Sequence, residues 1–179
     1  MYMKERAALN VLGAIRDEGL VEKIGCSVYT PEEAESCLRL PACEVIQVPF
    51  NLADKRLLAV DFFGKAKAAG KLVLVRSVYL QGLFFRRELP AGLADFGPLR
   101  AKLERLAAAE GLSLAEMALR YALSIDGIAS VIVGVETAAQ LESNLDMAER
   151  GGLPERLVTE IKDLGTAAVS VIDPRQWPR

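Results

Sequence analysis

Polar and aromatic residues stand at the ends of four apolar runs in the sequence, and these residue types could bind a ligand or perform chemistry. The runs span residues 23–29, 44–50, 71–79 and 130–135. The residues at their ends are Ser27, Tyr29, Gln47, Phe50, Asn51, Arg76, Ser77, Tyr79 and Gly134 to Thr137. If the runs are parallel strands, their carboxyl ends meet at the edge of the sheet where such folds bind ligands. These residues could then line one shallow pocket, although strand ends also need polar side chains for structural reasons alone.

One of these residues, Gln47, lies inside an otherwise apolar segment, EVIQVPF at residues 44–50. A buried amide without a hydrogen-bond partner costs about 1–3 kcal/mol, so Gln47 needs a partner, either the backbone or a ligand. Thr30 and Thr137 begin predicted helices, whose free N–H groups favour a phosphate. Every strand-to-helix loop has that property, so this second feature is generic.

The 179-residue chain contains no histidine, and this absence excludes several kinds of site. Ser-His-Asp and Cys-His nucleophiles and imidazole metal sites all require that side chain. Any chemistry within the chain therefore uses Tyr, Lys, Asp, Glu, Arg, Ser, Cys or a bound cofactor. Its 22 Lys and Arg nearly balance 24 Asp and Glu, for a net charge of −2 without a basic block. This balance argues against a nucleic-acid partner.

Three cysteines, Cys26, Cys37 and Cys43, have no C-x-x-C spacing and are odd in number. We expect buried free thiols in a reducing compartment, with Cys26 packed in the core and no metal site. The first residues lack the apolar core of a signal peptide, and no apolar run reaches the length of a membrane span. The sequence therefore predicts a cytoplasmic protein without a membrane partner.

The apolar runs alternate with helical patterns, which predicts an α/β fold with right-handed βαβ units and a parallel sheet. Helices are expected over residues 4–18, 55–69, 98–109, 113–124 and 154–164, and after Thr30 and Thr137. Four strands fit either an open, doubly wound sheet or part of a (β/α)8 barrel. The absence of a G-x-G-x-x-G motif after any strand weighs against a nucleotide-binding open sheet.

Three further expectations concern burial and domain organisation. The run at 71–79 is almost continuously apolar, which predicts a strand buried on both faces. Asp54, Lys55 and Arg56 form a mixed-charge group that we expect at the solvated start of a helix. We predict a single domain over residues 1–179, in which residues 165–179 form a loop tail.

Five segments stand in a fixed order and spacing: EGLVEKIGCSVYTPEEAE, VIQVPFNLADKR, VRSVYLQGLFF, LSLAEMALRYALS and VIVGVETAAQLESNLD. Together they resemble the aldo-keto reductase family. The resemblance implies a (β/α)8 barrel that reduces carbonyls with a nicotinamide cofactor, usually NADPH. It also implies that this chain corresponds to the fifth to eighth strands, the C-terminal half of a TIM-type barrel. The family's catalytic Asp, Tyr, Lys and His belong to the other half, so no catalytic residue is assigned here.

The same resemblance assigns cofactor contacts to residues at the strand ends. Ser27 and Gln47 match the residues that contact the nicotinamide amide. Arg76 matches the position that packs on the nicotinamide ring, where an aromatic side chain is usual, and Ser77 matches the serine at the pyrophosphate. Two further residues fall in the loop that covers the pyrophosphate, namely Tyr79 and Gln81.

At the adenine and 2′-phosphate end, the resemblance implies contacts from Gly134, Glu136, Gln140, Ser143 and Asn144. Gln140 stands where some members of the family have an arginine on the 2′-phosphate, and Ser143 stands where many have a glutamate. Glu136 adds a negative charge near the same site. The expected cofactor is NADPH, and NADH stays open as an alternative.

Two functions of different kinds follow. The first is the cofactor-binding half of a carbonyl-reducing oxidoreductase, which would act on a small carbonyl substrate only when an N-terminal half completes it. The second is a non-catalytic half-barrel that binds a nucleotide or associates with itself or a partner half through the open edges at 23–29 and 130–135. A truncated gene product is equally consistent with the sequence.

Overall fold

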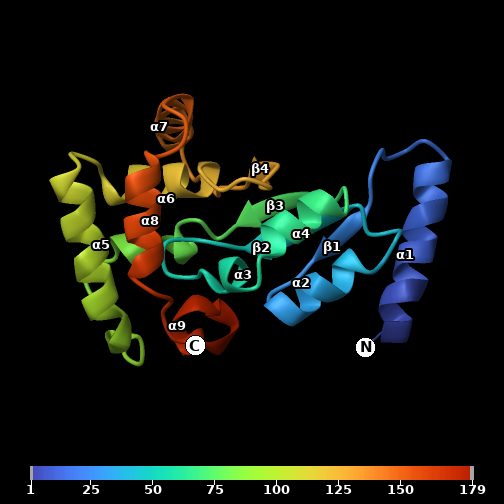
Figure 1. Cartoon of the computed structure of the whole chain (residues 1–179), viewed down its shortest axis with the longest axis horizontal. Coiled ribbons are helices and arrows are strands. Elements are labelled where there is room, and N and C mark those ends of the chain that lie inside the picture. The colour runs from blue at the N-terminus through green and yellow to red at the C-terminus, as the bar shows by residue number, and fades with distance from the viewer. Residues whose placement is uncertain (1, 178–179) are drawn as a thin grey trace.

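The computed structural model describes residues 2–177, in which strands and helices alternate (Figure 1). One parallel sheet holds the four strands β1 (Gly25–Ser27), β2 (Val45–Pro49), β3 (Leu72–Arg76) and β4 (Ser130–Val131). Their order in the sheet is the same as in the chain. A doubly wound sheet reverses its strand order at a switch point, whereas a barrel adds each strand beside the last. Of the two architectures that the sequence leaves open, the structure has the strand order of a (β/α) barrel.

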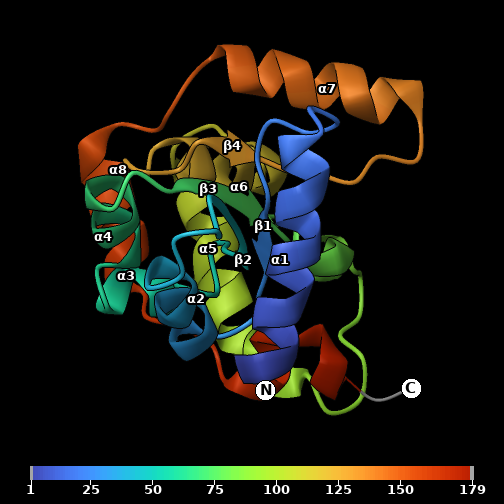
Figure 2. The same ribbon diagram turned by 90° about the vertical axis from the view of Figure 1, so that its right-hand side faces the viewer.

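Helices connect the strands, and α2 and α4 pack together on one face of the sheet (Figures 1 and 2). The helices are α1 (Tyr2–Asp17), α2 (Pro31–Leu38), α3 (Arg56–Ala59), α4 (Phe62–Ala68), α5 (Gly97–Ala109), α6 (Leu114–Leu123), α7 (Ala138–Glu149), α8 (Glu155–Asp163) and α9 (Val169–Ile172). Thr30, Ser113 and Thr137 each accept a hydrogen bond at the hydroxyl from the backbone N–H three residues on, which begins α2, α6 and α7. Within residues 2–177, no helix combines the length and the apolar character that crossing a membrane requires.

The helix predicted over residues 55–69 is two helices. The chain turns between α3 and α4 at Asp61, whose φ of +50° lies in the left-handed region. Aspartate tolerates that region better than most residues. The break redirects the chain so that both Phe62 and Phe63 enter the core, and burial of these rings outweighs the helix-forming pattern around them.

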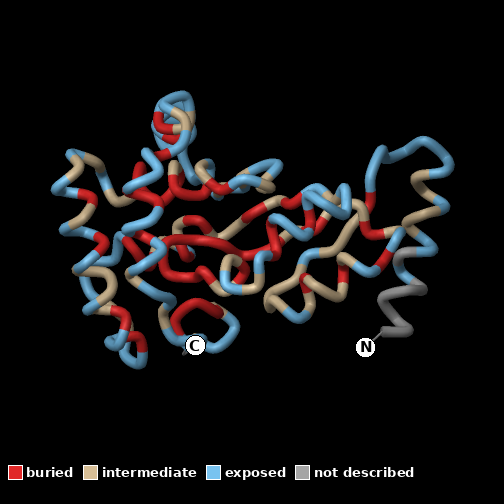
Figure 3. Tube along the Cα trace, in the orientation of Figure 1, coloured by how far each residue is buried: buried red, intermediate tan, exposed pale blue. Residues whose placement is uncertain are grey.

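Burial alternates along the two central strands, so only one face of the sheet is fully covered. Ile46 and Val48 on β2 and Val73 and Val75 on β3 are buried, whereas the residues between them are half-buried. Figure 3 shows the buried residues gathered in the middle of the molecule. The prediction that residues 71–79 are buried on both faces is therefore wrong. The physical reason is that β1 and β4 are the edges of an open sheet in the described chain, so no strand packs across its second face.

The mixed-charge group at residues 54–56 is largely buried, which corrects the expected solvated helix start. The Asp54 carboxylate accepts hydrogen bonds from the Arg56 guanidinium at 2.8 and 2.9 Å. The Lys55 ammonium donates to the carbonyl of Gly165 in the tail, and burial lowers the pKa of Lys55 to about 8. The tail excludes water from these charges, and residues so distant in the sequence could not be paired from it.

The tail predicted as a loop contains a short helix, α9, and a 3-10 turn at Pro174–Gln176. Val171 and Ile172 of α9 are buried, and the indole N–H of Trp177 donates to the carbonyl of Val171 at 2.9 Å. Burial of β-branched side chains against the core stabilises a helix that their intrinsic propensity does not favour. The last two residues of the predicted tail, 178–179, lie outside the described part of the chain.

Tyr121 of α6 is among the largest fully buried side chains, and it stacks on Phe50 with ring centroids 5.5 Å apart. Within the described residues its hydroxyl has no hydrogen-bond partner. Burial raises the pKa of this phenol well above its usual range, so it stays neutral. The ring contributes to the core, whereas the hydroxyl is desolvated without compensation.

We therefore expect Tyr121→Phe to raise the free energy of unfolding by about 1 kcal/mol, because it removes an unpaired buried hydroxyl and keeps the ring. Urea denaturation followed by circular dichroism measures this change. The matched control is Tyr79→Phe, which removes a hydroxyl that donates to Asn144 at 2.7 Å. The free energy of unfolding of that variant should fall by a similar amount. If the free energy of unfolding changed in the same direction in both variants, the argument would be contradicted.

Candidate cofactor site

A cavity of about 1010 Å³ opens at the carboxyl ends of β3 and β4, beside α7. Three segments of the chain supply most of its lining: the end of β3 with the loop after it, the segment after β4, and the face of α7, with Ala115 of α6 added to them. Nine of the eleven residues predicted to contact a cofactor line this cavity, namely Arg76, Ser77, Tyr79, Gln81, Gly134, Glu136, Gln140, Ser143 and Asn144. Most of the apolar part of its wall was not predicted and includes Phe85, Ile132 and Met147.

The loop after β3 has an unusual backbone. Ser77, Leu80 and Gln81 have φ values of +61°, +46° and +50°, and Asp61 is the one other described non-glycine residue with a positive φ. Each such residue costs on the order of 1–2 kcal/mol relative to ordinary geometry. Strain of this kind persists only where the surroundings enforce it, and it gathers at binding sites.

Asn51 is the side chain that holds this loop. It is fully buried at the end of β2, and its amide N–H donates to the carbonyl of Ser77 at 3.1 Å. Its amide oxygen accepts from the N–H groups of Ala53 and Asp54 at 2.9 and 3.0 Å. The sequence places Asn51 at a strand end as a candidate pocket residue. The structure instead makes it the connection between two strand ends, outside the cavity lining.

Arg76 spans the strand ends from the cavity toward β1. Its guanidinium donates to the carbonyl of Val28 at 3.3 Å and to the Ser77 hydroxyl at 3.2 Å. It also lies over the ring of Tyr29, 4.2 Å from the centroid, and Arg175 of the tail lies 3.8 Å from the same centroid. These cation–π contacts orient the Arg76 plane and bring the tail to the site. The sequence placed Tyr29 at the same edge of the sheet as Arg76, whereas the contact of Arg175 with the Tyr29 ring was not predicted.

Ser27 and Gln47 lie outside the cavity lining, but the structure pairs them with each other. They are register partners on β1 and β2, and the Ser27 hydroxyl donates to the Gln47 amide oxygen at 2.8 Å. Gln47 is only half-buried, on the less covered face of the sheet. The hydrogen-bond partner that we expected for the Gln47 amide is thus the Ser27 side chain on the adjacent strand. Its amide N–H₂ group is left to donate elsewhere.

The amino-terminal end of α7 borders the opposite side of the cavity. Thr137 caps the helix, and the Gln140 amide oxygen accepts from the N–H of Glu136 at 2.7 Å. The Tyr79 hydroxyl donates to Asn144 at 2.7 Å, which joins the loop after β3 to the middle of α7. Burial raises the pKa of Tyr79, so it remains a hydrogen-bond donor at neutral pH.

A buried carboxylate fixes the other end of α7. Glu116 of α6 accepts from Arg120 at 2.9 Å and from Arg150, the residue that ends α7, at 3.0 and 3.1 Å. Because α7 projects from the body of the molecule (Figure 2), this connection limits its movement over the cavity. Charged lining residues number two among those described: Arg76 at the strand ends and Glu136 beside α7.

Comparison with solved structures finds aldo-keto reductases with a similar arrangement of parallel strands and helices. An aldo-keto reductase from Bacillus halodurans, solved in apo and holo forms, is 24% identical, with TM-scores of 0.74 and 0.70. The match covers 94% of this chain and 59% or 58% of that enzyme. A glycerol dehydrogenase from Gluconobacter oxydans is 18% identical with a TM-score of 0.66, and the match covers 94% of this chain and 54% of that one. At these identities, the likeness establishes the fold alone.

The chain thus spans little more than half the length of the structures it resembles. No curated protein matches it significantly. The model of one family, described as the Aldo/keto reductase family, matches residues 3–166. That match extends over all four strands and the cavity between β3, β4 and α7. The chain therefore belongs to the aldo/keto reductase family, whose members are oxidoreductases.

Proposed function

We propose that this chain is the cofactor-binding half of a carbonyl-reducing oxidoreductase and that it holds a nicotinamide dinucleotide across its strand ends. One observation carries the proposal: nine residues that the family resemblance assigns to the cofactor come from three separate segments and surround a single cavity of about 1010 Å³. A volume of this size is typical of pockets that accept cofactors. Residues chosen at random from three separate segments would not be expected to line the same cavity.

The polar groups of the site fit the parts of such a cofactor. In this proposal the amide N–H₂ of Gln47 and the hydroxyl oxygen of Ser27, which lie beside the cavity rather than in its lining, hold the carboxamide of the nicotinamide. Arg76 offers a flat cation to the ring, and Ser77 lies at the start of the strained loop that would cover the pyrophosphate. When bound, the cofactor supplies the hydride for reduction of a carbonyl. The residues of this chain orient the ring, hold its amide and keep the phosphates in place.

The remaining part of the reaction requires groups that we place outside this chain. The chain covers 59% of the Bacillus halodurans enzyme it resembles, which supports a barrel with further strands. We assign the residue that protonates the carbonyl oxygen, and the substrate pocket, to those strands. The β1 and β4 edges of the open sheet are where they would pair.

The charges of the cavity favour NADH over NADPH. A carboxylate near the adenosine ribose accepts a hydrogen bond from its 2′-hydroxyl, whereas an arginine is suited to a 2′-phosphate. Here Glu136 borders the α7 end, and the described lining offers its single cation, Arg76, at the strand ends. The resemblance by itself implies NADPH, so the two lines of argument differ and a binding measurement separates them.

A second candidate function is supported by exposed apolar side chains on α7. Leu141 and Leu145 are 46% and 55% exposed, and Ile132 beside β4 is 40% exposed. A non-catalytic half-barrel that associates with a second copy through α7 and the β4 edge would cover these side chains. Such a protein would bind nucleotide without taking part in reduction.

The proposed cofactor contact predicts that Gln47→Leu weakens NADH binding about tenfold, because one hydrogen bond to the carboxamide is worth about 1–1.5 kcal/mol. Titration calorimetry on the full chain measures this. The control is Gln176→Leu, a glutamine of the tail, which should bind as the unaltered chain does. Equal losses in both variants, or no NADH binding by the unaltered chain, would overturn the proposal. Carbonyl-dependent oxidation of NADH by the chain alone would contradict the placement of the proton donor elsewhere.

The charge argument predicts that Glu136→Lys shifts the preference toward NADPH, by about tenfold in the ratio of dissociation constants at low salt. A lysine attracts the 2′-phosphate that the glutamate repels, and the shift should shrink at high ionic strength. Glu142→Lys makes the same charge change at an exposed position of α7 outside the cavity lining. An equal shift in that variant would attribute the effect to net charge rather than to the site.

The second candidate predicts a dimer in solution. Light scattering should then give twice the 19.4 kDa mass of the chain, and Leu145→Lys should return it to a monomer because the charge cannot be buried in the interface. Leu20→Lys, at a 70% exposed leucine in the segment after α1, is the matched control and should stay dimeric. A monomer at high concentration without any variant would exclude self-association.

A further inference from the structure

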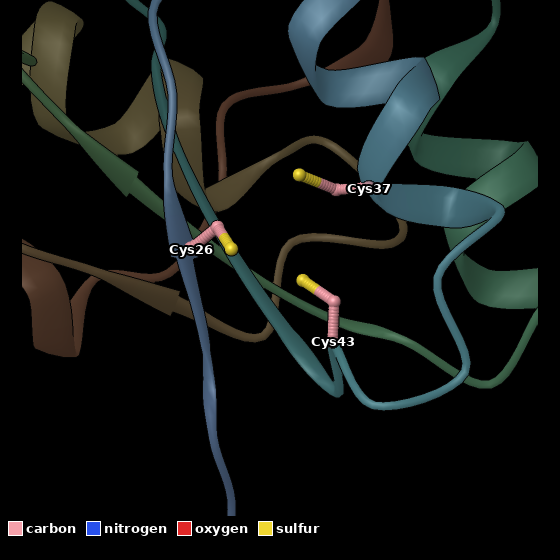
Figure 4. A group of neighbouring side chains, drawn as sticks. All are labelled: Cys26, Cys37 and Cys43. Atoms are coloured by element: carbon pink, nitrogen blue, oxygen red, sulfur yellow. The ribbon is translucent and has the colours of Figure 1, made fainter. Parts of the chain in front are cut away.

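Three cysteine side chains converge between α2 and the sheet (Figure 4). Cys26 comes from β1, Cys37 from α2, and Cys43 from the turn before β2. Their sulfur atoms all lie within 4.8 Å of one another. We call these three residues the thiol cluster. It lies outside the cofactor cavity, and the proposed function makes no use of it.

The separations within the thiol cluster suit a single metal ion. Zinc–thiolate bonds of about 2.3 Å place the sulfur atoms about 3.8–4.0 Å apart around a tetrahedral or trigonal ion. The present separations therefore need to close by at most about 1 Å, which side-chain rotation alone can supply. A disulfide would use two of the sulfur atoms and leave the third thiol beside it.

A positively charged side chain, that of Lys71, lies beside the thiol cluster and favours an anionic metal complex there. The Lys71 ammonium is held beside the cluster by the carbonyls of Leu40 and Pro41, at 2.9 and 3.4 Å. Three thiolates with Zn²⁺ carry one net negative charge, which the charge of Lys71 balances. Three thiolates with Cu⁺ would carry two net negative charges, and Lys71 would balance only one of them.

We propose that the thiol cluster is a zinc site with three cysteine ligands. Cys37 and Cys43 are buried, and Cys26 is half-buried. In the described chain no carboxylate joins the group. The bound ion links β1, α2 and the turn into β2, which together form the first βαβ unit of the sheet and include the strand that holds Ser27.

Cobalt(II) is the probe that tests the site, because its bonds to thiolate give a near-ultraviolet charge-transfer band and its visible bands report tetrahedral geometry. The full chain, reduced and freed of metal with a chelator, should bind one Co²⁺ with both signals, and one Zn²⁺ should displace it. The chain has no histidine, so any other binding would come from carboxylates and lack the charge-transfer band. Absence of that band in the unaltered chain would overturn the proposal.

Variants locate the ion. Cys43→Ser should lower zinc affinity by on the order of a hundredfold or more, since loss of a direct ligand exceeds the effect of an outer-shell change. Glu35→Gln, on the same helix as Cys37, removes a carboxylate outside the cluster and should leave zinc affinity unchanged. Circular dichroism checks that each variant is folded. A folded Cys43→Ser variant with unaltered zinc affinity would also overturn the proposal, and should that variant fail to fold, the cobalt spectrum of the unaltered chain decides.

Discussion

The hydrogen bonds of one buried side chain, Asn51, hold together the end of the sheet on which the candidate site is built. Asn51 joins the turn after β2 to the carbonyl of Ser77 after β3. Without that connection the left-handed backbone at Ser77 would relax, since nothing in its own sequence favours it. The positions of Arg76 and of the loop that carries Tyr79 depend on the same restraint. The fully buried side chain of Asn51 thus determines where the cavity opens.

The cavity is bounded by elements that are fixed independently of one another. The loop after β3 is held by Asn51 on one side and by the Tyr79–Asn144 hydrogen bond on the other. Helix α7 is held to α6 through Glu116 and Arg150. The site therefore has strand ends held by Asn51 on one side and, on the other, a projecting helix that is held at its middle and at its end.

Much of the fold and of the candidate site could be predicted from local patterns. Caps at Thr30, Ser113 and Thr137 mark helix starts because the hydroxyl acts on a backbone N–H only three residues away. Strand ends are equally local, and they placed Arg76, Ser77 and Tyr79 at the edge of the sheet where the cavity opens. The family resemblance, and not the local pattern, supplied the residues on the later loop and on α7, namely Gln81, Gln140, Ser143 and Asn144. The errors share a different cause. Burial of Lys55, the helix α9, and the one-sided burial of β3 depend on what packs against them, and those partners lie far away in the sequence.

Periodicity and motif spacing are properties of neighbouring residues, and they were enough to predict the strand and helix order, the family, and the residue types at the strand ends. Two other features became evident only from the packing of the chain in space. Gln47 is paired with Ser27, and three cysteines without a motif spacing form one cluster. Each of these features depends on contacts between elements that are not adjacent in the sequence. The free energy of such contacts comes from burial and shape across the whole core, which no local spacing encodes.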